Sequence, residues 1–121
     1  MNPLPYLHLM TRVDKDIEEC LEFISNQPRG NAEERESDIW AGIGRSWDRP
    51  KANRVACHRL DTGIDLRRCS AAQFVIVYAY LPPTNRFPNG IVSIRAVRHS
   101  RVADVFAGVR EPSVPYGICP T

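Results

Sequence analysis

One histidine stands among several arginines where a predicted strand ends. His99 follows the apolar segment 91–97, and Arg95, Arg98 and Arg101 lie at or just beyond the end of that segment. Imidazole titrates near neutral pH, which makes His99 the candidate general base or acid of this group. Guanidinium groups bind phosphate and carboxylate through a planar fork of donors, so the three arginines are candidate anion-binding residues. Together these residues predict a charged site at one rim of a sheet.

A second pair of cations, Arg67 and Arg68, lies in the predicted strand 65–69. Successive side chains of a strand point to opposite faces of the sheet, so the two guanidinium groups are expected on opposite faces. One of them is then solvated or paired with a helix carboxylate. The other faces the open side of the sheet, where it is available to a ligand.

The segment before these strands predicts a first amphipathic helix. Apolar residues recur at helical spacing from Val13 to Ile24, with acidic residues around the rest of the helix. Thr11 stands three positions before Asp14, which is typical of a helix-capping pair. The helix is expected to end near Gln27.

A second helix is expected directly after the first, so that the two form a hairpin. Asn31 is placed to cap it, and acidic residues in its first turn favour its N-terminus. Trp40 and Trp47 lie on its apolar stripe and are expected in the core. Gly42 and Gly44 weaken the helix, each by up to about 1 kcal/mol relative to alanine.

Apolar runs predict the strands. The expected strands are residues 5–10, 65–69, 73–81 and 90–97, and residues 55–60 are a candidate for a further short strand. Residues 73–81 are apolar at consecutive positions, so this strand is expected at the centre of the sheet with both faces buried. The loop 81–90 is long and rich in proline, and residues 103–109 are expected to form a short final helix.

The expected fold class is α+β, in the order β-α-α-β-β-β. A two-helix hairpin is expected to pack on one face of a three- to four-stranded antiparallel sheet. Residues 1–110 are expected to form a single domain, and residues 111–121 a proline-containing C-terminal tail.

Bulk composition sets few limits on function. The 121 residues carry a formal net charge of +2, which by itself does not indicate nucleic-acid binding. Acidic residues gather between positions 14 and 38 and arginines between 45 and 110, which predicts a basic face in the second half. The four cysteines have no paired spacing, so no metal site and no cofactor are expected, and free thiols in the cytoplasm are the expectation. No segment approaches the roughly 20 apolar residues that span a bilayer.

Several short patterns, taken together in this order, resemble the RelE/ParE superfamily of bacterial toxin components. Asp16 and Ile17, followed by Phe23 at helical spacing, are similar to the acid–aliphatic pair and later aromatic residue of the family's first helix. Residues 63–78 resemble its glycine, leucine-arginine, short turn and apolar strand ending in tyrosine. Residues 97–99 resemble the valine-x-histidine that closes its last core strand. The resemblance covers residues 6–106 and is nearest to the ParE-like, plasmid-stabilisation branch.

The resemblance implies the toxin component of a type II toxin–antitoxin system, neutralised by a cognate antitoxin protein. Its ParE-like branch inhibits DNA gyrase, and gyrase is therefore the expected target. The alternative is a RelE-like, ribosome-dependent mRNA endonuclease. A degenerate, non-toxic homologue is a further alternative, because Ala96 and Ser100 stand where the family usually has arginine and glycine.

The candidate site residues depend on which function holds. In the nuclease alternative the catalytic residues are His99 as base or acid and Arg67 and Arg95 as phosphate ligands. The competing interpretation makes His99 a structural residue, hydrogen-bonded at the strand end. The candidate target- or partner-binding residues are Arg68, Arg98 and Arg101.

Overall fold

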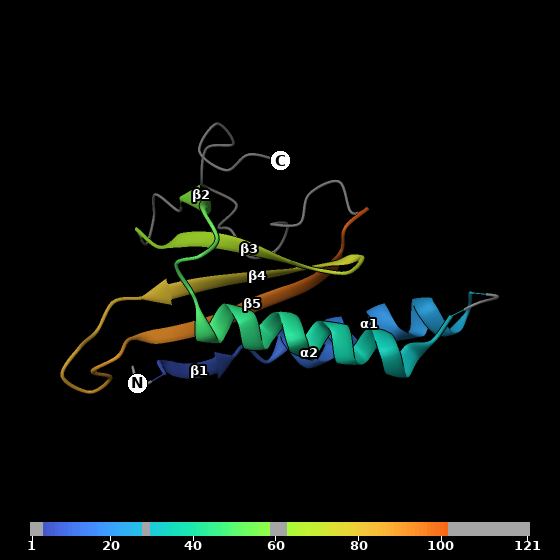
Figure 1. Cartoon of the computed structure of the whole chain (residues 1–121), viewed down its shortest axis with the longest axis horizontal. Helices are drawn as coiled ribbons and strands as arrows, with labels where there is room; N and C mark the ends of the chain where they lie inside the picture. The colour runs from blue at the N-terminus through green and yellow to red at the C-terminus, as the bar shows by residue number, and fades with distance from the viewer. Residues whose placement is uncertain (1–3, 28–29, 59–62, 102–121) are drawn as a thin grey trace.

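The computed structural model describes residues 4–27, 30–58 and 63–101 of the chain. The elements are β1 (Tyr6–Leu9), α1 (Arg12–Ser25), α2 (Ala32–Asp48), β2 (Val55–His58), β3 (Asp65–Ala71), β4 (Phe74–Leu81) and β5 (Ile91–His99). The two helices lie side by side against the sheet (Figure 1). The α+β class and the helix pair are therefore confirmed.

The sheet is larger than expected and is mixed rather than antiparallel. Its strand order is β1-β5-β4-β3-β2, with β1 parallel to β5 and every other neighbouring pair antiparallel. The expectation of three or four antiparallel strands is wrong for two reasons. The short segment Val55–His58 pairs with β3 and adds a strand. Strand β1 reaches β5 through both helices instead of a tight turn, and a long connection leaves a strand free to pair in parallel.

Strand β4 lies at the centre of the sheet, as its apolar sequence predicts. Six of its eight residues are buried, beginning with Phe74. One apolar cluster joins α1 and α2 to the sheet face that includes Ile76 and Tyr78, which we call the helix face. A smaller cluster, which includes Val75 and Val77, lies on the opposite face. Strand β4 is therefore buried on both faces and pairs with β3 on one side and β5 on the other.

The ends of the two helices differ in how they are capped. Asn31 has an extended backbone, and its side-chain oxygen accepts a hydrogen bond from the N–H of Glu34 at 3.1 Å, which confirms the predicted cap. Thr11 has helical dihedral angles and makes no side-chain cap. The predicted cap at Thr11 is wrong, because a capping side chain needs an extended backbone to reach the free N–H groups.

The two tryptophans of α2 lie in different environments. Trp47 is half-buried and donates from its indole nitrogen to the carbonyl of Pro5 at 2.6 Å, which ties α2 to the chain before β1. Trp40 is 42% exposed, so the expectation that it belongs to the core is wrong. The core positions of α2 near it are instead Ile39 and Ile43.

The loop between β4 and β5 is held by its own hydrogen bonds. The N–H of Phe87 donates to the hydroxyl of Thr84 at 3.1 Å, and the N–H of Thr84 donates to the carbonyl of Phe87 at 3.0 Å. Gly90 ends the loop at a φ of +83°, where a Cβ would lie 2.6 Å from the carbonyl oxygen of Leu81. Glycine is therefore required at the start of β5.

The remaining expectations divide between confirmed, wrong and untested. Cys20 and Cys69 have free thiols, whereas Cys57 is disulfide-bonded, so the expectation of free thiols is wrong at Cys57. Neither described helix is long and apolar enough to cross a membrane. The expected helix 103–109 and the tail 111–121 lie outside the described residues.

Candidate functional site

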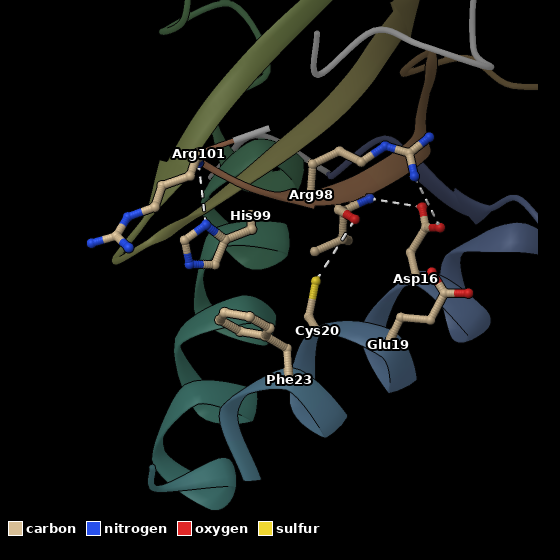
Figure 2. A pocket seen from close by; sticks show the side chains of 8 residues that line it. Asp16, Glu19, Cys20, Phe23, Arg98, His99 and Arg101 are labelled. Atoms are coloured by element: carbon tan, nitrogen blue, oxygen red, sulfur yellow. Dashed lines mark hydrogen bonds and ion pairs between the residues drawn. The ribbon is translucent and has the colours of Figure 1, made fainter. Parts of the chain in front are cut away.

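A cavity of about 380 Å³ lies between α1 and the last residues of β5. Its lining combines an apolar floor with charged groups of both signs (Figure 2). The lining residues are Asp16, Glu19, Cys20, Phe23, Val97, Arg98, His99 and Arg101. The helix supplies the first four and the end of the strand supplies the rest. His99, Arg98 and Arg101 therefore line one cavity, and α1 forms its other wall.

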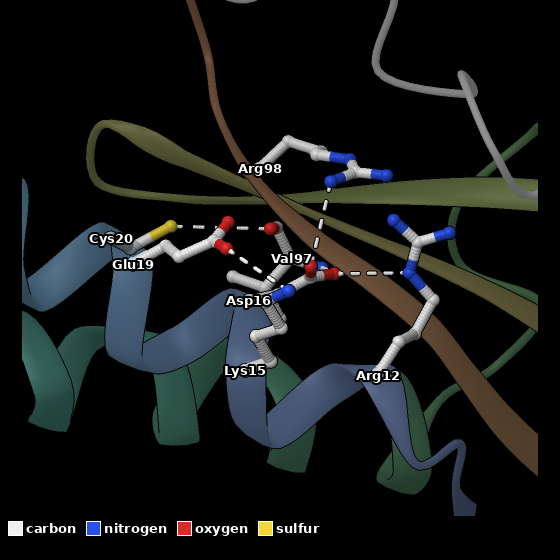
Figure 3. A network of polar contacts seen from close by, with 7 residues as sticks. All are labelled: Arg12, Lys15, Asp16, Glu19, Cys20, Val97 and Arg98. Carbon is white, nitrogen blue, oxygen red and sulfur yellow. Dashed lines mark hydrogen bonds and ion pairs between the residues drawn. The ribbon is translucent and has the colours of Figure 1, made fainter.

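Asp16 is the central polar contact between the two walls (Figure 3). Its carboxylate is 5% exposed and accepts a hydrogen bond from the backbone N–H of Val97 at 3.1 Å. Arg12 lies 3.6 Å from one carboxylate oxygen and Arg98 lies 3.5 Å from the other. A buried carboxylate is tolerated when it is paired and hydrogen-bonded in this way. Asp16 therefore joins the helix to the strand and is not available to a ligand.

Cys20 continues this contact one turn along α1. Its thiol donates to the carbonyl of Val97 at 3.9 Å, so Asp16 and Cys20 together bind both peptide groups of Val97. The pKa of the Cys20 thiol is raised to about 11, first by burial and then by the nearby Asp16 carboxylate. The thiolate is the reactive form of cysteine, so Cys20 is not suited to nucleophilic chemistry near neutral pH.

The imidazole of His99 is held from three sides. Its Nδ1 accepts a hydrogen bond from the backbone N–H of Arg101 at 3.1 Å. Phe23 and Phe74 pack edge-on against the ring, with centroid distances of 5.5 and 5.9 Å. Because Nδ1 accepts this hydrogen bond, a neutral ring carries its own proton on Nε2. In this arrangement His99 offers a donor, and it can act as a base only after giving up the hydrogen bond to Arg101.

The outward-facing edge of β5 has different neighbours on α1 at Val97 and at His99. The N–H of Ser100 donates to the carbonyl of Gln73 across the β4–β5 ladder at 2.8 Å. Since hydrogen-bonded and non-hydrogen-bonded pairs alternate in an antiparallel ladder, the peptide groups of His99 and Val97 face away from β4. Pairing with β1 ends at Ile94, so these outward groups lie beyond the last paired residue. Asp16 and Cys20 bind the outward N–H and carbonyl of Val97. Phe23 is the residue of α1 that packs on the His99 ring.

The structure separates Arg67 from His99. Arg67 pairs with Tyr78 on β4, whereas His99 pairs with Phe74, four residues away along the same strand. At about 3.4 Å per residue this is a separation of about 14 Å along the sheet, with β4 between the two residues. Arg67 instead donates to the carbonyl of Asn53, beside the buried hydroxyl of Tyr78. The three residues of the nuclease hypothesis do not form one cluster.

The other predicted arginines lie in three different places. Arg95 is the extra residue of a β-bulge, because Ala96 pairs with Val77 and Ile94 with Tyr78. Arg68 is exposed and alternates with Arg67, so it lies on the face opposite the helices, and the sequence left open which of the two arginines would do so. Arg98 and Arg101 line the cavity together with His99. Of the candidate partner-binding residues, the structure therefore brings two together and leaves Arg68 apart.

Sequence reasoning missed the helix side of this site. Asp16, Cys20 and Phe23 follow one another at spacings of four and three, which places them on one face of α1. In the sequence this pattern indicates an apolar core stripe and resembles the family's first helix, but it does not indicate a partner strand. An acidic residue inside that stripe is the signal that could have indicated a buried contact.

The described residues were also compared with metal-binding arrangements, and the chain with known proteins. Within residues 4–27, 30–58 and 63–101, no group of three or more histidine, cysteine, aspartate or glutamate side chains could hold a metal ion. No protein-family model matches the chain, and no curated protein matches it either.

Proposed function

We propose that this protein is the toxin component of a type II toxin–antitoxin system, of the ParE-like kind, neutralised in the cytoplasm by a cognate antitoxin protein. Its target in this proposal is DNA gyrase. The proposal extends the sequence resemblance described above, and it makes the protein a binder of other proteins rather than an enzyme.

One contact carries the proposal. The two short patterns on which the resemblance depends, the acid–aliphatic pair of the first helix and the valine-x-histidine of the last strand, are 81 residues apart in the chain. They meet directly, because Asp16 binds the peptide groups of Val97 together with Cys20. The two patterns therefore build one contact of the fold, which supports interpreting them together and not as separate chance matches.

The geometry at His99 favours protein binding over RNA cleavage. General base catalysis needs an unprotonated nitrogen within reach of the substrate hydroxyl. The acceptor nitrogen of neutral His99, Nδ1, already accepts a hydrogen bond from the N–H of Arg101. Arg67 lies in a separate cluster with Asn53 and Tyr78, where it cannot help to hold the same phosphate.

The nuclease alternative keeps one observation in its favour. His99, Arg98 and Arg101 line one cavity, and Nε2 of a neutral His99 carries a proton that could be given to a leaving oxygen. A cleavage mechanism at this site would use His99 as the acid and a different group as the base.

Expression of the full chain in bacteria tests the proposal. Induction of the chain alone is expected to stop growth, and co-expression of the adjacent small open reading frame is expected to restore it. Normal growth and viability at a confirmed level of folded protein would contradict the proposal and favour the non-toxic homologue.

A further inference from the structure

We infer that residues 102–121 cover the sheet face opposite the helices and are held there by a disulfide between Cys57 and Cys119. This inference is independent of the proposed function, since it concerns how the chain closes its own second sheet face. The redox state of one cysteine pair then decides whether that face is closed.

The first observation is that the sheet face opposite the helices is buried. Its apolar cluster consists of side chains that are 0–1% exposed, namely Cys57, Leu66, Val75, Val77, Ala79 and Ala96. Neighbouring strands lie about 4.8 Å apart and their side chains stand roughly perpendicular to the sheet, so alanine and valine cannot cover one another from above. Within residues 4–27, 30–58 and 63–101, both helices pack on the helix face and all the strands belong to this one sheet. A further layer of the chain must therefore cover the second face.

The second observation is the state of the cysteines. The chain has four of them, Cys20, Cys57, Cys69 and Cys119. Cys57 is disulfide-bonded, whereas Cys20 and Cys69 have free thiols. Within one chain, Cys119 is the partner that remains for Cys57. Because the Cys57 side chain belongs to the cluster opposite the helices, the bond brings Cys119 to that face.

The third observation is the path that this bond requires. Strand β5 ends at His99, and Cys57 lies on β2, with β4 and β3 between the two strands. Cys57 is in register with Ser93 through the intervening pairs, so the two ends of the path are about 25 Å apart on a diagonal across the sheet. The 20 residues from His99 to Cys119 can span up to about 65 Å. This path crosses β4 and β3, which contribute most of the buried cluster.

Length and composition distinguish this segment from the other stretches outside the described residues. Residues 1–3, 28–29 and 59–62 contain no more than four residues each, so none is long enough to cover strands β2 to β5. Residues 102–121 number 20, and half of them are apolar, among them Val105, Phe106 and Ile118. Apolar side chains of the segment and of the sheet face can therefore be buried together, which favours the closed arrangement.

Reduction of the bond releases the cover. A dithiol such as dithiothreitol supplies two electrons and two protons, so that its own thiols become a disulfide and Cys57 and Cys119 each become a thiol. The cytoplasm keeps thiols reduced through glutathione and thioredoxin. The closed form is therefore expected under oxidising conditions and the open form under reducing ones.

Disulfide mapping of the full chain tests the pairing. The purified chain is equilibrated with oxidised and reduced glutathione, unfolded in the presence of iodoacetamide and cleaved with trypsin without reduction. A linked pair of peptides, residues 55–59 and 111–121, is expected, with Cys20 and Cys69 alkylated. The inference is overturned if Cys57 is alkylated, or if it is linked to Cys20, to Cys69 or to a second chain.

Binding of the dye ANS, which reports exposed apolar surface, tests the cover. Fluorescence of the oxidised chain with ANS is expected to rise when dithiothreitol is added. Cys119→Ser is expected to show the higher fluorescence with or without dithiothreitol, while near-UV circular dichroism checks that the core stays folded. Cys69→Ser is the matched control, because Cys69 has a free thiol on the helix face, and it should respond to dithiothreitol as the unmodified chain does. Unchanged fluorescence of the unmodified chain on reduction would overturn the inference, as would a response of Cys119→Ser equal to that of the unmodified chain.

Discussion

The carboxylate of Asp16 accepts a hydrogen bond from the backbone N–H of Val97, at 3.1 Å, across 81 residues of sequence. In this position a helix side chain takes the place of a neighbouring strand, because β1 pairs with β5 only as far as Ile94. The contact fixes the end of β5 against α1 and leaves the cavity beyond it.

Asp16→Ala is expected to destabilise the fold by about 3–5 kcal/mol, because it leaves the Val97 N–H and the charge of Arg98 without this partner. Asp16→Asn keeps an acceptor for Val97 and is expected to cost about 1–2 kcal/mol. Urea unfolding of the purified variants measures both values. Asp14→Ala is the control on the same helix, since Asp14 is exposed. Equal losses for Asp14→Ala and Asp16→Ala would contradict the structural role of Asp16.

The two glycines inside α2 are expected to respond in opposite directions to the same substitution. A Cβ at Gly42 would lie 2.6 Å from the Cβ of Ala71, so Gly42→Ala pushes the helix off the sheet and is destabilising. At Gly44 nothing lies within 4 Å, so Gly44→Ala is expected to stabilise the fold by about 0.5–1 kcal/mol. Thermal unfolding of both variants measures the signs, and equal shifts would show that α2 does not pack as described.

The fold is expected to lose stability at alkaline pH. Burial raises the pKa of Tyr78 above its ordinary value of about 10, and burial raises the pKa of Cys20 from about 9 to about 11. A pKa raised by folding contributes stability that is complete below the unfolded value and lost as pH rises through the folded value. The free energy of unfolding should therefore fall above about pH 9, by Cys20 first, and further above pH 10.

Tyr78→Phe separates these two contributions. The Tyr78 hydroxyl donates to the carbonyl of Pro50 at 2.7 Å and accepts from Asn53 at 3.1 Å, so its loss is expected to cost about 1–3 kcal/mol at pH 7. The same variant should lose the part of the pH dependence that lies above pH 10. Urea unfolding from pH 7 to 11 measures both effects. An unchanged slope above pH 10 in Tyr78→Phe would assign that slope to another group.

Local patterns of the sequence predicted the elements better than the contacts between them. Helix α1 was predicted from the apolar spacing between Val13 and Ile24, and the central strand β4 from its consecutive apolar residues. In both elements the sequence pattern directly reflects which side chains are buried. The parallel pairing of β1 with β5 could not be predicted in this way, since no turn joins the two strands. A four-residue strand such as Val55–His58 is also too short to show a clear alternation of apolar and polar residues.

The candidate site was predicted in part for the same reason. His99, Arg98 and Arg101 are close in sequence, so their shared cavity follows from the end of one strand. Arg67 is remote in sequence, and its distance from His99 depends on the register between β3, β4 and β5. The contribution of Phe23 depends on how α1 lies along β5, which is a tertiary contact that periodicity does not define.

His99→Asn is expected to preserve the function, if His99 is a structural residue. The side-chain oxygen of asparagine can replace Nδ1 as the acceptor for the N–H of Arg101, two residues later, but it cannot transfer protons near neutral pH. His99→Ala removes this acceptor and the ring contacts with Phe23 and Phe74, so it should lower stability by about 1–2 kcal/mol. Growth inhibition by each variant, at matched levels of folded protein, is the readout. Loss of inhibition in both variants with an intact fold would favour proton transfer by His99.

The target assay tests the central claim most directly. The purified chain is added to DNA gyrase with relaxed plasmid and ATP, and, in parallel, to ribosomes translating a defined mRNA. We predict that supercoiling by gyrase is inhibited in a concentration-dependent way and that the mRNA stays intact. Codon-specific mRNA fragments, with unaffected gyrase, would contradict the account.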